Sequence, residues 1–204
     1  MVLINRLRIF FLLSFLLPAL CWSQKKEVSI RIGQDETLLL DQYENEIVLK
    51  RKGFKIQVLL ENVAGVYVFA AFTDSICCRL TEADSISGFM DLPDRTMREP
   101  EFNKDKELLV NDDNSCAYWY YDKETSWRGF NRKVVLLDDG RVVAVKTVKQ
   151  LYYVPEQRAI KVKDIDIDKP LYLLFVAVSE FDGGGKPLKE LMRRKVKISW
   201  VYDD

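Results

Sequence analysis

Three aspartates at alternate positions have the residue type and spacing of a metal site: Asp164, Asp166 and Asp168 in the stretch VKDIDIDKP. In an extended chain alternate side chains share one face and lie about 7 Å apart, so two of them can approach one calcium ion. Calcium takes roughly 6–8 oxygen ligands, more than this stretch offers. The apolar positions change phase near Lys163, which predicts a strand end or a bulge there. We expect solvated carboxylates and no bound metal.

The stretch AYWYYDKETSWRGF has the chemistry of a recognition surface. Alternation along a strand sends Trp119 and Tyr121 to one face and Tyr118 and Tyr120 to the other. One aromatic face can line the core, whereas the other needs cover from a loop, a partner or a ligand such as a sugar ring. Core and cross-strand packing is the default interpretation of this stretch. If it binds a ligand, we predict Trp119, Tyr121 and Trp127 as the binding residues.

Three cysteines remain once the N-terminal region is set aside. Cys77 and Cys78 are adjacent, and Cys116 lies in a distant segment. Neighbouring side chains on a strand point to opposite faces, so Cys116 can form a disulfide with Cys77 or with Cys78 but not with both. Buried cysteines acting as small hydrophobic residues are the favoured interpretation, and one such disulfide is the alternative.

The chain contains no histidine. Ser-His and Cys-His nucleophile pairs, zinc sites with histidine ligands and the commonest general base near neutral pH are therefore excluded. No catalytic residues and no cofactor are predicted. An enzyme without histidine would have to use other groups, for example two carboxylates as in many glycosidases.

The first 23 residues have the three parts of a secretory signal peptide. A short basic start with Arg6 and Arg8 precedes an apolar stretch at 9–17, and a polar run follows. That stretch is shorter than the roughly 20 residues that span a bilayer. We predict cleavage after Ser23 and export to the periplasm, the cell surface or the medium, with no transmembrane segment in the mature chain. Lipid anchoring at Cys21 is the less favoured alternative, because bulky Leu20 precedes it.

The charge balance gives no sign of nucleic-acid binding. The chain has 31 Lys and Arg and 31 Asp and Glu; removing residues 1–23 takes away Arg6 and Arg8 and no acid, so the mature net charge is about −2. A nucleic-acid-binding protein usually carries a marked basic surface. One basic cluster does occur near the C-terminus, and we interpret it as a solvated face: Lys189, Arg193, Arg194, Lys195 and Lys197.

Period-two patterning predicts strands along most of the mature chain. Apolar residues alternate through 54–60, the continuous apolar runs at 63–72 and 169–178 predict strands buried on both faces, and RKVVLLDDGRVVAVKTV predicts a hairpin. A final strand should turn Val196, Ile198 and Trp200 inward. Helical signals are confined to a capping box at 81–84 and one or two turns from Pro187 to Met192.

Many strands without long helices predict an all-β protein, an antiparallel β-sandwich of the immunoglobulin-like or jelly-roll-like kind with one or two short helices. We expect a single domain over 24–204 that contains a long polar excursion at 91–115. Two small β-units that divide near 91–115 are the alternative.

The favoured function is an exported, non-catalytic binding protein of the cell envelope that recognises a glycan or a protein partner. A carboxylate-dependent hydrolase, such as a glycosidase, is the first alternative. A structural or assembly subunit of the envelope is the second.

Overall fold

The computed structural model describes residues 28–40, 44–60, 65–75, 107–112, 118–122, 133–136, 142–181 and 187–203, and most of these are β-strand. The prediction of an all-β protein is confirmed. The first strands are β1 (Val28–Gln34), β2 (Thr37–Leu40), β3 (Glu46–Lys50), β4 (Phe54–Leu60), β5 (Gly65–Ala71), β6 (Glu107–Val110) and β7 (Tyr118–Asp122). The remaining strands are β8 (Lys133–Leu136), β9 (Val142–Val148), β10 (Gln150–Tyr153), β11 (Arg158–Lys161), β12 (Leu171–Phe181) and β13 (Pro187–Val201).

The strands of the first sheet are all antiparallel, in the order β2-β1-β4-β9-β8. A tight turn joins β1 to β2, and its two central residues, Asp35 and Glu36, have φ angles of 48° and 67°. Two successive positive φ angles suit the twist of a hairpin. The pairing of β8 with β9 confirms the predicted hairpin.

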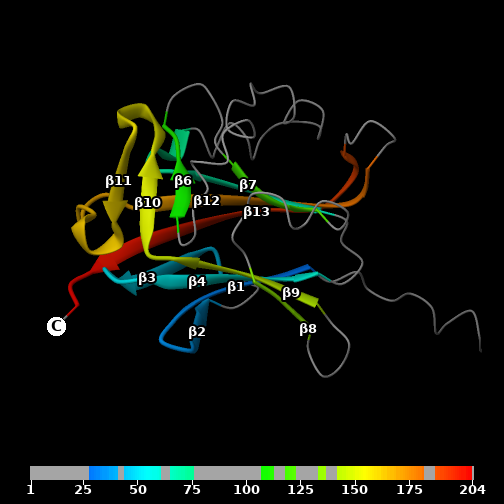
Figure 1. Ribbon diagram of the computed structural model, residues 1–204, viewed down its shortest axis with the longest axis horizontal. Helices are drawn as coiled ribbons and strands as arrows, with labels where there is room; N and C mark the ends of the chain where they lie inside the picture. Colours follow the sequence, from blue (N-terminus) through cyan, green and yellow to red (C-terminus); the bar gives the residue numbers. More distant parts are fainter. Residues whose placement is uncertain are drawn as a thin grey trace, which may run out of the picture.

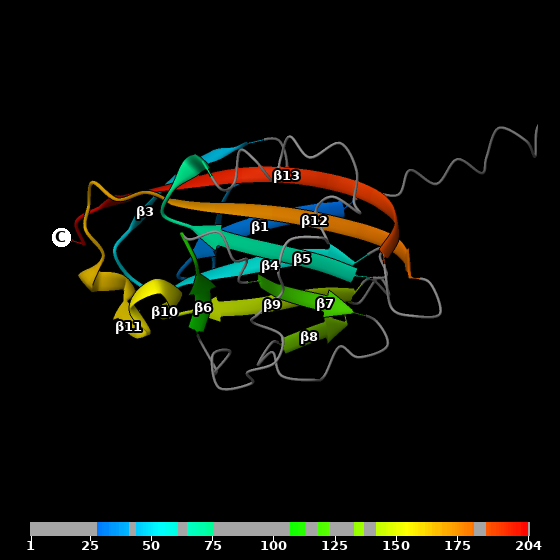
Figure 2. The same ribbon diagram turned by 90° about the horizontal axis from the view of Figure 1, so that it is seen from above.

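The second sheet has the order β3-β13-β12-β5-β7. Seen from above, its strands β13, β12, β5 and β7 lie side by side (Figure 2). β3 joins the edge of β13 in a parallel pairing, with Glu46 opposite Lys197, and the other pairs are antiparallel. The pairing of β3 with β13 joins segments that are about 150 residues apart in the chain, so local sequence patterns carry no signal for it.

The two five-stranded sheets form two layers with one hydrophobic core between them (Figure 1). The first sheet contributes residues such as Ile32 and Ile56, and the second contributes residues such as Leu173 and Phe175. The rings of Phe54 in β4 and Trp200 in β13 meet across the layers, with 6.1 Å between their centroids. This face-to-face arrangement is similar to that of a β-sandwich.

Burial follows the predicted alternation. In β13 the side chains of Val196, Ile198 and Trp200 are buried, and the residues between them are partly exposed. β5 and β12 are buried on both faces, as their continuous apolar runs predict: the adjacent residues Leu173 and Leu174 are both fully buried.

The predicted helical turns from Pro187 to Met192 are wrong, because these residues form the first part of strand β13. The spacing of Leu188, Leu191 and Met192 suits one face of a helix, but pairing with β12, interrupted by register shifts, holds the segment in a strand. Proline is tolerated at the first residue of a strand. The described residues contain two short 3-10 helices instead, at Val154–Glu156 and Val162–Asp164; the predicted capping box at 81–84 lies outside the described residues.

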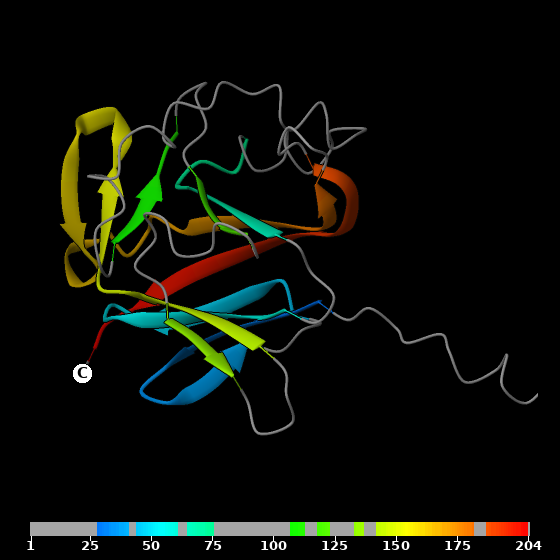
Figure 3. The same ribbon diagram turned by 45° about the vertical axis from the view of Figure 1, so that its right-hand side comes forward.

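A third sheet of three strands, in the order β11-β10-β6, stands at one end of the two layers (Figure 3). Its strand β6 belongs to the stretch 91–115 that was predicted as a polar excursion; residues 91–106 and 113–115 lie outside the described residues. Both five-stranded sheets combine strands that precede this stretch with strands that follow it.

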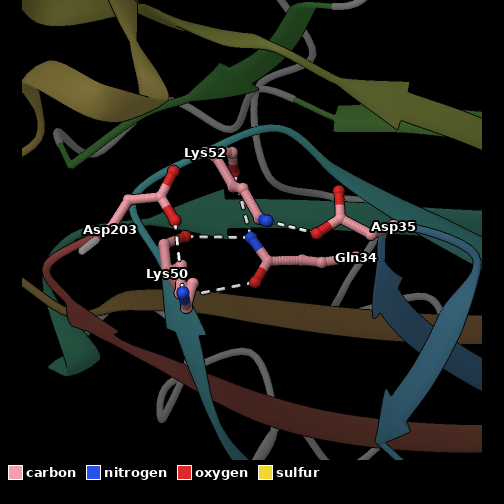
Figure 4. Close-up of polar contacts among 5 residues, drawn as sticks. All are labelled: Gln34, Asp35, Lys50, Lys52 and Asp203. Carbon is pink, nitrogen blue, oxygen red and sulfur yellow. Dashed lines mark hydrogen bonds and ion pairs between the residues drawn. The ribbon is translucent and has the colours of Figure 1, made fainter.

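Gln34, at the end of β1, ties the first sheet to the turn that connects β3 with β4 (Figure 4). Its side-chain amide donates to the carbonyl oxygens of Lys50, at 2.9 Å, and Lys52, at 3.2 Å, and it accepts from the Lys50 amide at 3.1 Å. Around this contact lie two exposed ion pairs, Lys52 with Asp35 and Lys50 with Asp203. The hydrogen bond to Asp35 raises the pKa of Lys52.

A second polar contact holds the segment that follows β5. The amide of Thr73 donates to the Asp112 carboxylate at 2.7 Å, and the amide of Asn111 donates to the Ala70 carbonyl at 2.9 Å. The pKa of Tyr153 is raised above its usual value. Burial of the side chain is the larger cause, and its hydrogen bond to Asp112 is the second. These contacts fix the backbone next to Asp74, a residue that lines a groove on the second sheet.

Candidate functional site

A groove with a volume of about 490 Å³ lies at the second sheet, where β3, β13, the start of β12 and the segment after β5 meet. Its described lining residues are Asn45, Glu46, Asp74, Tyr172, Arg193, Arg194, Lys195 and Lys197. The size is that of a typical small-ligand site.

Strand alternation explains why charged residues of β13 line this groove. Val196 and Ile198 turn into the core, so Lys195 and Lys197 project from the opposite face of the sheet. Tyr172 lies opposite Lys197 in the register of β12 and β13, and residues directly opposite each other share a face. The pattern therefore places two lysines and one tyrosine ring together.

Each of the two lysines faces a carboxylate. Lys195 Nζ lies 2.8 Å from Asp74 Oδ1, and Lys197 Nζ lies 3.7 Å from Glu46 Oε1. The carboxylate side chains are well exposed, 45% for Asp74 and 75% for Glu46. Ion pairs of this exposure contribute only about 0–1 kcal/mol, so a ligand can replace either partner at small cost.

The two arginines are held more firmly. Arg193 makes a two-point contact with Glu190, with Nε at 2.9 Å and Nη2 at 2.6 Å from its carboxylate oxygens, and its side chain is only 11% exposed. Arg194 donates to the side chain of Asn45 at 3.3 Å and to the carbonyl of Glu44. The arginine side chains are therefore held in place by their own contacts. The lysines and the acids are the more accessible charges of the groove.

Most of the basic cluster that we interpreted from the sequence as a solvated face lines this groove. Arg193, Arg194, Lys195 and Lys197 all line it, whereas Lys189 is exposed on the same strand and is not among the lining residues. Sequence reasoning did not connect this cluster with Asn45, Glu46 or Asp74, because those residues reach it through long-range strand pairing.

The three predicted metal-site candidates, Asp164, Asp166 and Asp168, are exposed. Strand β11 ends at Lys161, close to the predicted phase change, and a 3-10 helix followed by a turn carries the three aspartates. The carboxylate of Asp166 accepts a hydrogen bond from the Asp168 amide at 3.1 Å, as aspartates do in turns. In the part of the chain that the structure describes, no group of three or more acidic or thiol side chains is placed to hold a metal.

We expect the simultaneous replacement of Asp164, Asp166 and Asp168 by asparagine to change the free energy of unfolding by at most about 1 kcal/mol. The aspartates are exposed, and asparagine keeps the acceptor oxygen that the turn at Asp166 uses. Calcium or EDTA should leave the melting temperature of the native chain unchanged. A rise in melting temperature with calcium that disappears in the triple variant would restore the metal site.

The predicted binding aromatics lie partly in strand β7. Its backbone register with β5 places Trp119 opposite Val68 and Tyr121 opposite Val66, two residues buried in the core. Trp127 lies outside the described residues, as do Cys21, Cys77, Cys78 and Cys116. The roles of these residues stay predictions.

If Trp119 and Tyr121 form a recognition surface, replacing either with alanine should change stability by less than about 1 kcal/mol and weaken ligand binding by about 1 kcal/mol or more. A buried aromatic cut to alanine costs about 3–5 kcal/mol instead. Thermal melting of Trp119→Ala and Tyr121→Ala, beside Tyr118→Ala and Tyr120→Ala, separates the two cases. Unfolding of both Trp119→Ala and Tyr121→Ala would assign these residues to the core.

Comparison with known protein families, with curated protein sequences and with solved structures finds no match to this chain. In the described ranges, no helix is long and apolar enough to cross a membrane. The chain is an all-β protein of several sheets with a charged groove on one of them.

Proposed function

We propose that this chain is an exported, non-catalytic binding protein of the cell envelope, which recognises a glycan or a protein partner in the groove beside β13. The single observation that carries the proposal is the groove itself, with charges of both signs, an amide and a tyrosine ring around about 490 Å³. Such a mixed lining offers hydrogen-bond donors, acceptors and an apolar surface to one ligand.

The strand pairing and the side-chain contacts around the groove support binding as its role. Lys195, Lys197 and Tyr172 stand on paired strands of one sheet, and Arg193 is held by two contacts to Glu190. Side chains that are already ordered lose little entropy when a ligand binds, which raises affinity.

A glycoside hydrolase is the second candidate, because the groove contains two carboxylates, Glu46 and Asp74. Such an enzyme needs one carboxyl group that holds a proton for the leaving group. Here each carboxylate faces a lysine ammonium, at 3.7 and 2.8 Å. Both acids are therefore engaged in ion pairs, which supports a binding site. Release of reducing sugar that Glu46→Gln abolishes would establish the hydrolase instead.

The binding proposal is tested with the mature chain on a glycan array and in a pull-down from envelope extract. The groove variant Lys195→Gln/Lys197→Gln runs in parallel, and Lys189→Gln is the matched control because it removes the same charge from the same strand outside the groove. We expect a ligand that the native chain and the control retain and the groove variant loses. Equal retention by all three chains, or no ligand in either assay, would contradict the proposal.

Export is a separate prediction. We expect the secreted chain to begin at Gln24, because the apolar stretch ends before Ser23 and a polar run follows it. N-terminal sequencing or intact mass measurement of material from the producing cells checks this. A lipid on Cys21, or an uncleaved N-terminus held in the membrane, would contradict it.

A further inference from the structure

We infer that the ligand of the groove beside β13 is an acidic saccharide, a sugar that carries carboxylate groups together with free hydroxyls. In this arrangement Lys195 and Lys197 bind the carboxylates, and Glu46 and Asp74 accept hydrogen bonds from the hydroxyls. The inference rests on the proposed function, and it adds the chemical class of the ligand.

The two lysines provide the anion-binding part. They are two residues apart on one strand, so their side chains leave the same face of the sheet about 7 Å apart. Their side chains are 32% and 35% exposed, and each is paired with a carboxylate that is more exposed still. A ligand carboxylate can therefore bind beside Lys195 or Lys197 while Asp74 and Glu46 remain in the groove as acceptors, and no buried charge is left unpaired.

The two acids make the groove selective for an acidic saccharide over other anions. Glu46 and Asp74 lie within the groove, so they repel a ligand that consists of negative charges alone. Ionised carboxylates only accept hydrogen bonds, and sugar hydroxyls are suitable donors. A ligand that suits both the lysines and the acids combines anionic groups with hydrogen-bond donors, and an acidic saccharide offers both as carboxylates and hydroxyls.

The remaining lining residues suit a sugar ring as well. Tyr172 is partly exposed in the groove, and an aromatic ring gives the apolar face of a sugar a surface to pack on. Asn45 adds an amide, which both donates and accepts. An acidic peptide uses the lysines equally well, but its donors to Glu46 and Asp74 are backbone amides alone, fewer than the hydroxyls of a sugar; it is the rival ligand in the experiment.

The experiment is calorimetric titration of the mature chain with three probes of similar length: an oligogalacturonate, a neutral cello-oligosaccharide and an oligoglutamate peptide. We expect the oligogalacturonate to bind most tightly, and its affinity to fall as salt is raised. Lys195→Gln/Lys197→Gln should weaken that binding by about tenfold or more, whereas Lys189→Gln should leave it within about twofold. Circular dichroism and melting of each variant show that it is folded.

Glu46→Ala is the decisive variant, because the two explanations of oligogalacturonate binding predict opposite changes in affinity when this acid is removed. If Glu46 accepts a sugar hydroxyl, its removal weakens oligogalacturonate binding by about threefold or more. If the groove only attracts negative charge, removing this acid strengthens binding. Glu46 is 75% exposed, so the replacement leaves the core intact.

Several results would overturn the inference. They are stronger binding after Glu46→Ala, equal or tighter binding of the oligoglutamate peptide, or no measurable affinity for the oligogalacturonate. Tighter binding of the neutral sugar, lost in the groove variant, would overturn the acidic ligand class while leaving the proposed glycan-binding function in place. The absence of any ligand on the glycan array and in the envelope extract would instead contradict the proposed function itself.

Discussion

Replacing Lys146 with alanine should lower the free energy of unfolding by about 2–5 kcal/mol, the range for truncating a long buried side chain. Lys146 lies in β9 with no exposed surface, although lysine is an ionisable residue. It stands opposite the fully buried Ile56 of β4, and the next residue on its face, Val148, belongs to the core. A buried lysine nitrogen needs an interaction partner, and the Lys146 side chain has one.

Two further variants make this result specific. Lys146→Met keeps most of the volume of the stem, so it should recover a large part of the lost stability. Lys55→Ala removes a lysine from the adjacent strand, where the side chain is 33% exposed and paired with Glu36; it should cost at most about 1 kcal/mol. Chemical denaturation of the four chains is the measurement. Stability of Lys146→Ala within about 1 kcal/mol of the native chain would contradict an interior role for this residue.

The second large effect is expected at Gln34. Replacing it with alanine should cost about 2–4 kcal/mol, because its amide makes three hydrogen bonds to the backbone of Lys50 and Lys52 and is only 6% exposed. The backbone groups left behind lie in the turn that leads from β3 to β4, where the chain passes from one sheet to the other. Loss of these contacts removes a link between the two layers (Figure 4).

Asp35→Asn is the matched control for Gln34, because it changes the neighbouring residue of the same turn. Asp35 is 70% exposed and pairs with Lys52 on the surface, so the loss should not exceed about 1 kcal/mol. Asparagine also tolerates the positive φ angle of 48° at this position. Equilibrium unfolding in urea compares the variants, and equal stability of Gln34→Ala and Asp35→Asn would refute the assigned role.

The strands were predictable where a local pattern fixes the face of each residue. Val196, Ile198 and Trp200 are buried as the alternation predicts, and β5 and β12 are buried on both faces as their apolar runs predict. The segment from Pro187 was wrongly expected to be helical, since Leu188, Leu191 and Met192 fit the spacing of a helix as well as the edge of a strand. Pairing with β12 makes this segment a strand and not a helix, and a local sequence pattern carries no information about that pairing.

The sequence by itself determined the all-β class and the inward side of most strands, because a side-chain period of two is a property of a single extended segment. It also located the basic cluster in β13. The tertiary structure alone decided that Glu46, Asp74 and Tyr172 stand beside Lys195 and Lys197. Those residues come from β3, the segment after β5, and β12. Their meeting depends on strand order and register, which are set by the packing of the whole core. The buried position of Lys146 depends on the same packing, because a lysine in an apolar strand is interior only when distant segments cover and pair it.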